Sequence, residues 1–259
     1  MSIMAEEIDR ASPAVRPAGR PAGYHRWHTL LFVHWRVDPA VLEPLLPRGL
    51  TLDTWEGSAW VGLVPFAISG LRPRWLPPLP GVSAFNEINV RTYVHCNGRD
   101  PGVWFFSLDA TNALAVHVAR WRWRLNYFHN AMRIRRTGDI IHYESARRGH
   151  ERRSGARLVA QIGRRIGHDE PHRAAPAGYT IPGTLSHFLL DRYVLYAQRG
   201  NEPLLQARVH HVPYCVQEAG LLACEQTLLA ANGIRPDEPP CHVAYCERAD
   251  VEVFSPRRV

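Results

Sequence analysis

Polar and apolar residues alternate strictly between Phe85 and His95. The polar positions are Glu87, Asn89, Arg91, Tyr93 and His95, and the positions between them are Ile88, Val90, Thr92 and Val94. Because successive side chains of a strand point to opposite faces, this alternation predicts a strand with one polar and one apolar face. A turn at Asn97-Gly98 and an apolar run over residues 102–108 predict the partner strand of a hairpin.

Apolar and aromatic runs divided by Gly, Pro and Asn predict that most of the remaining chain forms strands. These strands are expected at residues 29–37, 50–55, 58–68, 132–136, 140–146, 157–166, 193–197, 204–212 and 242–254, with 50–55 and 58–68 forming a hairpin around Glu56-Gly57. Helices are expected directly after Asp38, at 112–124, at 186–192 after Thr184, and at 219–231. About ten strands with two to four short helices predict a mainly β (α+β) fold, a large antiparallel barrel or sandwich, because so many strands need closure or stacking to hide their edges.

The first 23 residues differ in composition from the rest of the chain. They mix charge, proline and glycine without an apolar run, so residues 1–23 are expected to be a disordered tail before a single domain over residues 24–259. No stretch approaches the roughly 20 apolar residues of a membrane-spanning helix, and no basic-then-apolar leader begins the chain. We therefore expect a cytoplasmic protein without membrane contact, whose five cysteines are free thiols.

Arginine dominates the charge of the chain. Each of the 31 basic residues is arginine, the chain contains no lysine, and the net charge is +7. A lysine amine that would form an imine with a carbonyl substrate is therefore absent. Fourteen arginines lie between Arg120 and Arg173, so the sheet expected from Arg133 to Arg165 carries a basic face. Such a face is typical either of a solvated surface, which we favour, or of a nucleic-acid interface, for which no motif is present.

Histidine and cysteine are numerous, but their spacing does not match known metal sites. The sets Cys241/Cys246, His168/His172 and His210-His211 are each incomplete, and neither HExxH nor a paired CxxC occurs. The chain also lacks GxGxxG, a Walker loop and GxSxG. The sequence therefore predicts no metal and no cofactor, and it offers no motif for nucleotide binding or serine hydrolysis.

Several strings, in order along the chain, resemble one bacterial family. They are HWRVDPAVLEPLLPRGLTLD, AWVGLVPFAI with a downstream RPR, FNEINVRTYV, PGVWFFSLDA, AVHVAR and the later His210-His211 with Pro213. From about Tyr24 onward the chain is similar to the YqjF-like family of unknown function, in the acetoacetate-decarboxylase-like superfamily. The resemblance implies a conical antiparallel barrel whose lumen, in the enzymes of the superfamily, holds a small carbonyl ligand.

The resemblance also implies where a site would lie. The decarboxylase pattern of an aromatic residue, a spacer and a glutamate is similar to Phe85-Asn86-Glu87, which makes Glu87 the matching carboxylate. The reactive lysine of the enzymes would fall near residues 125–129, where this chain has Tyr127 and His129. Imine chemistry through a side-chain amine is therefore excluded here.

Two functional hypotheses follow, and they depend on where the polar face of the alternating strand points. If it points into a lumen, Glu87 is an acid, base or anchoring carboxylate, Arg91 its charge partner or an anion binder, and Asn89 a ligand contact. Tyr127 then donates a hydrogen bond and His129 shuttles a proton during the binding, or lysine-independent conversion, of a small carbonyl or carboxylic compound. If the face is solvated, these are ordinary surface residues, and the alternative is a non-catalytic module that binds nucleic acid or a protein through the arginine-rich face.

Overall fold

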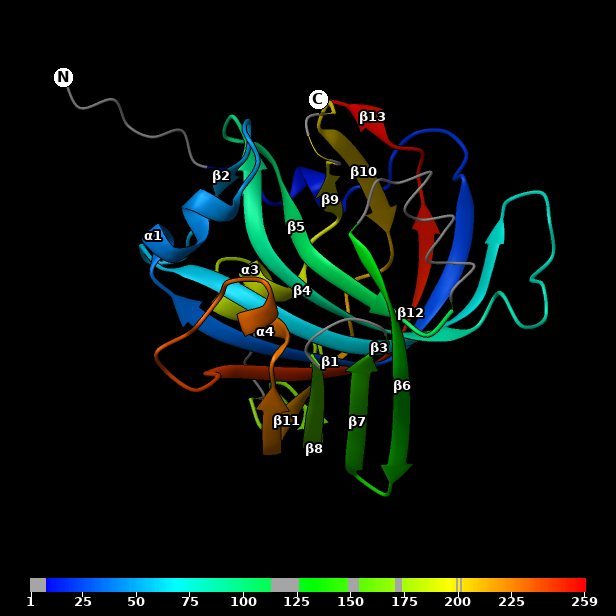
Figure 1. Ribbon diagram of the computed structural model, residues 1–259, viewed down its shortest axis with the longest axis vertical. Coiled ribbons are helices and arrows are strands. Elements are labelled where there is room, and N and C mark those ends of the chain that lie inside the picture. The colour runs from blue at the N-terminus through cyan, green and yellow to red at the C-terminus, as the bar shows by residue number, and fades with distance from the viewer. Residues whose placement is uncertain (1–7, 113–125, 149–153, 171–173, 199, 201) are drawn as a thin grey trace.

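Long curved strands wrap around a common interior, with short helices at its margins (Figure 1). The structure is a computed structural model that describes residues 8–112, 126–148, 154–170, 174–198, 200 and 202–259. The helix expected at 112–124 lies, beyond Asn112, outside these described residues.

The described strands all join one mixed sheet. They are β1 Gly23–Val37, β2 Thr51–Leu52, β3 Ala59–Pro73, β4 Phe85–Cys96, β5 Arg99–Ala110, β6 Tyr127–Thr137, β7 Ile140–Arg147, β8 Gly155–Arg165, β9 Val194–Ala197, β10 Leu205–His210, β11 Val216–Gln226, β12 His242–Val253 and β13 Arg257–Arg258. The described helices are η1 Ser12–Ala14, α1 Pro39–Leu42, η2 Glu43–Leu45, α3 Leu185–Leu190 and α4 Leu228–Ala231. None of these helices is long and apolar enough to cross a membrane.

The sheet forks at both edges of its centre, which has the order β5-β4-β3-β1-β12. At one edge, residues 103–104 of β5 pair with β9 and residues 108–110 pair with β6, both in parallel. At the other edge, residues 252–253 of β12 pair with β10 and residues 244–246 pair with β11. The strands β9 and β10 therefore close a smaller ring with the centre, while β6, β7, β8 and β11 close a larger ring. The pairings between the other strands are antiparallel, as predicted, and the two parallel pairings at β5 were not predicted.

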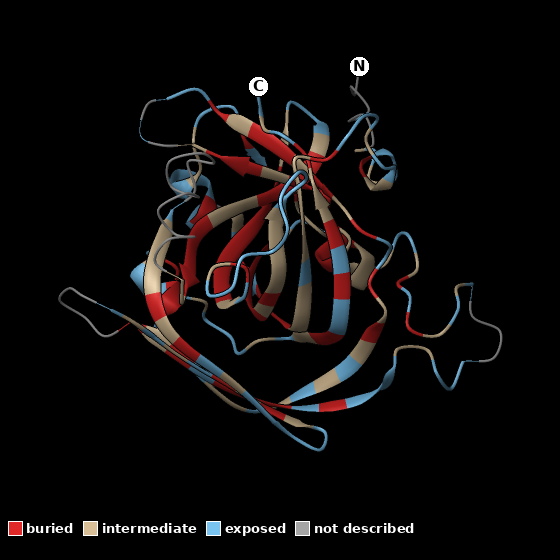
Figure 2. Ribbon diagram, turned by 90° about the vertical axis from the view of Figure 1, so that its right-hand side faces the viewer, coloured by how far each residue is buried: buried red, intermediate tan, exposed pale blue. Residues whose placement is uncertain are grey.

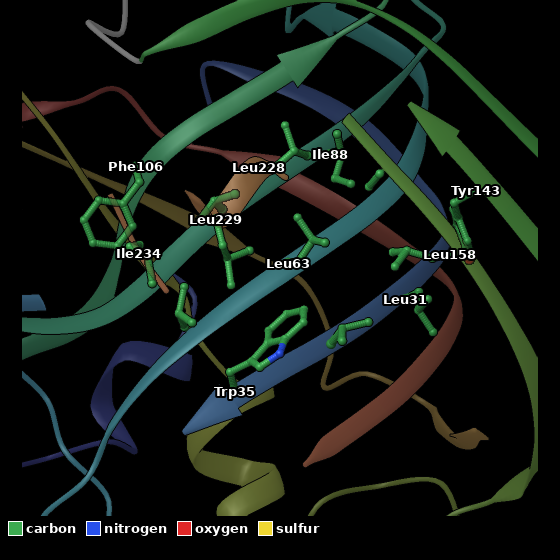
Figure 3. Packing of buried hydrophobic residues seen from close by; sticks show 14 of the residues in the cluster. Leu31, Trp35, Leu63, Ile88, Phe106, Tyr143, Leu158, Leu228, Leu229 and Ile234 are labelled. Carbon is green, nitrogen blue, oxygen red and sulfur yellow. The ribbon is translucent and has the colours of Figure 1, made fainter. Parts of the chain in front are cut away.

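The central strands are buried on both faces because each ring covers one face. On β1, Leu31 and Val33 pack in the core of the larger ring, and Leu30 and Phe32 pack with Val209 of β10 on the opposite face. The larger core joins β1, β3, β4 and β5 to β7, β8 and α4, as Figure 3 shows for Leu31, Trp35, Leu63, Ile88, Phe106, Tyr143, Leu158, Leu228 and Leu229. Buried residues accordingly gather on the central strands, and exposed residues lie on the outer hairpins (Figure 2).

The predicted strand at Phe85–His95 is confirmed as β4, and both of its faces are buried. Ile88 and Val90, at 0% exposure, belong to the core of the larger ring. Glu87 and Asn89, on the opposite face, are only 3% and 4% exposed. The polar face of β4 therefore points into the molecule, on the side of the smaller ring.

Two predicted helix starts are confirmed. The carboxylate of Asp38 accepts a hydrogen bond from the backbone N–H of Ala40 at 2.9 Å, which caps α1. The hydroxyl of Thr184 accepts one from the backbone N–H of His187 at 3.3 Å, which caps α3. Both caps satisfy backbone donors that have no partner inside a helix.

The predicted hairpin between residues 50–55 and 58–68 is only partly correct. The tight turn forms, because Glu56 and Gly57 both have positive φ and Trp55 bridges to Ser58. The strand β2, however, pairs with the end of β4 and not with β3. The edge of β3 is already taken by β4, which covers it over eight residue pairs and leaves no place for a hairpin partner.

The helix predicted at residues 219–231 is wrong for most of its length. Residues 216–226 form β11, which pairs with β8 and β12, and only Leu228–Ala231 is helical. A register shift between Leu221 and Ala223 explains the error. It makes Ala219, Leu221 and Cys224 the residues that pack on the larger core, so their spacing changes from two to three and imitates the face of a helix. Pairing of residues 219–226 with β8 overrides the helix propensity of this Ala- and Leu-rich segment.

Part of the predicted tail packs on the barrel. Arg10 pairs with the buried Asp53, and Arg16 pairs with Glu252 at 2.5 Å. Arg208 donates to the carbonyl of Pro13 at 2.7 Å. Residues 8–22 are therefore held against the β-rich body by charge and backbone contacts, and the single domain over residues 24–259 stays a prediction.

Candidate functional site

Glu87 and Tyr127 meet inside the barrel although they are 40 residues apart in sequence. Glu87 lies on β4 opposite Phe66 of β3 and Ala110 of β5. Tyr127 begins β6, which runs parallel to the end of β5 and so brings its side chain beside β4. The Tyr127 hydroxyl donates a hydrogen bond to Glu87 Oε2 at 2.8 Å. The fold thus assembles a carboxylate–phenol pair from two predicted site residues.

The surroundings of Glu87 bring the pKa of its carboxyl group close to neutral pH. The pKa of Glu87 is raised to about 7, mainly because burial in the low-dielectric interior disfavours the charged form. The nearby Asp109 contributes to the same increase. Hydrogen bonds from Tyr127 and Asn89 act in the opposite direction by stabilising the carboxylate. The pKa of Tyr127 is raised well above its usual value by burial and by Glu87, so its hydroxyl keeps its proton. A carboxyl group with a pKa near the working pH is suited to general acid–base catalysis.

Asn89 and Arg91 continue the polar face beyond Glu87. Arg91 is 8% exposed, and its Nη2 donates to the carbonyl of Leu189 at 3.2 Å and lies 3.5 Å from the Tyr93 hydroxyl. Among the described residues, Asn89 Oδ1 and Arg91 Nε are buried without a hydrogen-bond partner. Because buried polar atoms are almost always paired in folded proteins, this acceptor and this cationic donor are atoms with which a small polar ligand would pair.

Aromatic side chains line the same face of the sheet. Trp27 packs against Phe66 at 5.7 Å and against His211 at 5.8 Å between ring centroids. His211 Nδ1 lies 2.7 Å from the carbonyl of Val212 and must donate to it, so its buried Nε2 carries a lone pair. Neither this nitrogen nor the indole N–H of Trp27 has a hydrogen-bond partner in the described part of the chain. Arg91 lies over the ring of Phe32, with 5.5 Å between its guanidinium carbon and the ring centroid. The interior next to Glu87 is therefore apolar and carries a few unpaired polar atoms.

Sequence reasoning gave these aromatic residues no place in the site, because they come from separate segments. It named His211 only within the family resemblance and an incomplete metal set. Trp27 stands in a strand whose predicted start is Thr29, and His211 follows β10. Only the pairing of β1 with β3 and β12 brings them near the polar face of β4. No local motif marks them.

The structure separates His129 from the Glu87–Tyr127 pair. His129 lies two residues further along β6 and lines a groove of about 810 Å³ at the ends of β6, β7, β8 and β11. The groove is also lined by Arg133, Glu144, Arg148 and Arg157. In the described part of the chain, no group of three His, Cys, Asp or Glu side chains is arranged to hold a metal ion.

The arginine-rich face is partly neutralised by carboxylates. Arg136 pairs with Glu247 at 2.6 Å, and Arg157 pairs with Glu225 at 2.9 Å. Inside the barrel, Arg147 holds the fully buried Asp109 at 2.5 Å. These pairs reduce the field that the face presents to a polyanion, although Arg133 and Arg135 stay exposed.

The forked barrel defines the fold class to which the chain is similar. The enduracididine biosynthesis enzyme MppR complexed with pyruvate superposes with a TM-score of 0.62 at 15% identity, over 94% of this chain and 93% of that chain. An acetoacetate decarboxylase-like enzyme from Sphingomonas wittichii RW1 superposes with a TM-score of 0.60 at 15% identity, over 93% and 94% of the two chains. At this identity the likeness shows the fold, which is that of the acetoacetate decarboxylase-like proteins.

The chain belongs to the DUF2071 family of uncharacterized conserved proteins, which it matches over residues 24–250. It is 36% identical over 233 residues to the uncharacterized protein YqjF of Bacillus subtilis (strain 168), with 90% of each chain covered. The predicted family resemblance and the predicted mainly β, acetoacetate-decarboxylase-like fold are both confirmed.

Proposed function

We propose that the chain binds a small carbonyl or carboxylate compound beside Glu87 and transfers a proton to or from it. The observation that carries this proposal is the buried Glu87–Tyr127 pair, with 2.8 Å between the hydroxyl and the carboxylate and a Glu87 pKa of about 7. A group half-protonated at neutral pH accepts a proton from a carbon next to a carbonyl, or donates one to the carbonyl oxygen.

The neighbouring polar atoms suit an anionic or carbonyl ligand. Arg91 supplies a cationic Nε–H that has no hydrogen-bond partner among the described residues, and we assign it the carboxylate or carbonyl oxygen. Asn89 holds Glu87 with its amide and offers its unpaired Oδ1 to a donor on the ligand. Tyr127 stabilises the ionised Glu87 and turns its hydroxyl to the ligand oxygen when Glu87 takes up a proton. Burial among aromatic side chains strengthens each of these interactions.

The substrate class follows from the same atoms. MppR, which shares the fold, has been solved with pyruvate and with the condensation product of pyruvate and imidazole 4-carboxaldehyde. A 2-keto acid offers a carbonyl to Glu87 and Tyr127, and its carboxylate is an anion that the buried Arg91 cation on the same face favours, so we place this class first. Since this chain has no lysine, the reaction proceeds without an imine to a side-chain amine. We keep the cytoplasmic location and the contribution of His129 as predictions from the sequence.

A thermal-shift panel tests the proposal. Pyruvate, longer 2-keto acids, aldehydes and lactones are each added to the native protein, to Glu87→Gln and to Glu144→Gln, which alters an exposed glutamate as a matched control. A ligand that binds only the folded state raises the melting temperature. We expect a 2-keto acid to stabilise the native protein and the control but not Glu87→Gln.

The alternative, a non-catalytic module that binds through the arginine-rich face, is tested in the same panel with a short oligonucleotide. Stabilisation by the oligonucleotide that falls steeply with salt, together with no shift from any small molecule, would replace our proposal with that alternative. A keto acid that stabilises Glu87→Gln as much as the native protein would place the ligand elsewhere.

A further inference from the structure

A second set of interacting side chains lies outside the Glu87–Tyr127 pair. Ser186 of α3, His242 of β12, His34 of β1 and Tyr93 of β4 form an unbroken line of hydrogen bonds. Ser186 Oγ lies 3.1 Å from His242 Nε2, and the Nδ1 atoms of His242 and His34 are 3.0 Å apart. His34 Nε2 lies 2.7 Å from the Tyr93 hydroxyl. The four residues come from four separate elements, so no sequence motif signals them.

The backbone carbonyl at the buried end gives this line one direction. The Tyr93 hydroxyl lies 2.9 Å from the carbonyl of Leu189, and a carbonyl only accepts, so Tyr93 donates its single proton there. His34 Nε2 must then donate to Tyr93, which leaves His34 Nδ1 with a lone pair. His242 Nδ1 must therefore donate to His34, and His242 Nε2 accepts the proton of Ser186.

Packing holds the buried end of the line in place. His34 and Tyr93 are both 0% exposed. Gly62 makes space for the imidazole, since a Cβ atom at this position would lie 3.0 Å from His34 Cδ2 and 3.2 Å from its Nε2. Burial lowers the pKa of His242 to about 4 and that of His34 well below its usual value, so both rings are neutral at pH 7 and the lone pair on His242 is present.

Ser186 and His242 are only half-buried, in contrast to His34 and Tyr93. A half-buried serine hydroxyl, an imidazole that accepts its proton and a third group that orients the imidazole are the parts of an activated serine nucleophile. We propose that Ser186 is a nucleophile that accepts an acyl group from small esters, with His242 as its base and His34 and Tyr93 as positioning residues. This site shares no residue with the keto-acid site, and the two meet where Arg91 Nη2 lies 3.5 Å from the Tyr93 hydroxyl.

The acyl transfer is balanced with the groups present and the ester. The Ser186 oxygen forms a bond to the ester carbonyl carbon and passes its proton to His242 Nε2. The bond from that carbon to the alcohol oxygen then breaks, and His242 returns the proton to the departing alcohol. Water repeats the two steps in place of serine, which releases the carboxylic acid and restores Ser186.

Labelling with a fluorophosphonate probe tests the proposal, because the probe forms a stable bond to activated serine oxygens with loss of fluoride. The native protein is labelled, digested and mapped by mass spectrometry. The chain provides its own control in Ser69, whose hydroxyl lies 2.7 Å from His28 Nε2 and which is half-buried like Ser186. The other ring nitrogen of His28 forms no hydrogen bond to the described residues, so that pair has no third member. We expect label on Ser186 at least ten times faster than on Ser69.

Variants assign the roles within the line. His242→Gln is expected to lower the labelling rate about 100-fold, the usual contribution of a general base. Tyr93→Phe removes only the hydroxyl that fixes the direction of the hydrogen bonds, and we expect a smaller loss with an unchanged circular dichroism spectrum. Turnover of p-nitrophenyl acetate by the native protein is expected to fall in the same order. Absence of label on Ser186, equal label on Ser69, or an unchanged rate in a folded His242→Gln or Tyr93→Phe variant would overturn the proposal.

Discussion

The two faces of β4 are buried to nearly the same degree but consist of opposite chemistry. Ile88 and Val90 face a core built mainly of apolar side chains and stabilise the fold by removing surface from water. Glu87, Asn89 and Arg91 face the other ring, where burial without full hydrogen bonding costs free energy. The contrast teaches that burial alone does not separate the two faces, and that the polar face, retained at such a cost, is the one on which the proposed site rests.

The largest expected effect comes from the apolar face. Ile88→Ala removes three carbon atoms from a fully buried position, and we expect it to lower the free energy of unfolding by about 2–5 kcal/mol. Urea unfolding at pH 7 measures this. A loss under about 1 kcal/mol would mean that the larger core is loosely packed and that the two faces differ less than described.

On the polar face, removal of the Glu87 charge is expected to raise the free energy of unfolding relative to the native protein as pH rises. This is opposite to the loss expected for Ile88→Ala. The pKa of Glu87 is 4.5 in its ordinary state and about 7 when folded, so between these values the folded state binds the extra proton. Stability therefore falls as pH rises from about 4.5 to about 7 and is level above that, a loss of roughly 3 kcal/mol from this group. Glu87→Gln abolishes this loss, so the variant gains on the native protein as pH rises from 5 to 8. An equal difference between the two proteins at every pH would contradict the assignment.

A smaller effect is expected from Tyr127→Phe. The Tyr127 hydroxyl stabilises the Glu87 carboxylate, so its removal raises the pKa of Glu87 further and costs about 1 kcal/mol at pH 8. A carbon-13 NMR titration of the Glu87 carboxyl in labelled protein reports the change directly. A lowered pKa in the variant would show that Tyr127 does not donate to Glu87.

The smallest effect is expected outside the barrel. Arg157 and Glu225 form an exposed ion pair at 2.9 Å, and Arg157→Gln is expected to change the free energy of unfolding by no more than about 0.5 kcal/mol. Thermal unfolding at low and at physiological salt measures this change. A loss above about 1 kcal/mol would show that the arginine-rich face has a structural role comparable to the interior.

The sequence predicts the fold best where a pattern depends on one strand alone. The alternation from Phe85 to His95 is complete within a few residues, and β4 forms there. The segment at 219–231 fails because a register shift, set by β8, decides which side chains of β11 face the core. The sequence of β5 likewise does not predict the fork, because the fork arises only when β6 and β9 pair with different parts of the same edge of β5.

The residues of the candidate site could also be predicted from the sequence only in part. Glu87 and Tyr127 were identified by resemblance to enzymes, and the structure places them 2.8 Å apart. Trp27, His211 and the line from Ser186 to Tyr93 depend on contacts between residues that are distant in the chain. The alternation on β4 also did not reveal that both faces are covered, because a second ring is a property of the whole sheet.

The pairing of β1 with β12 sets an order of events during synthesis. These strands join residues 23–34 to residues 242–253, so the centre of the sheet unites the two ends of the chain (Figure 1). As long as β12 is still inside the ribosome, β1 has one unpaired edge and neither ring can close. We therefore expect folding to wait for β12, and a nascent chain that stalls before residue 242 to expose a long apolar strand edge to chaperones.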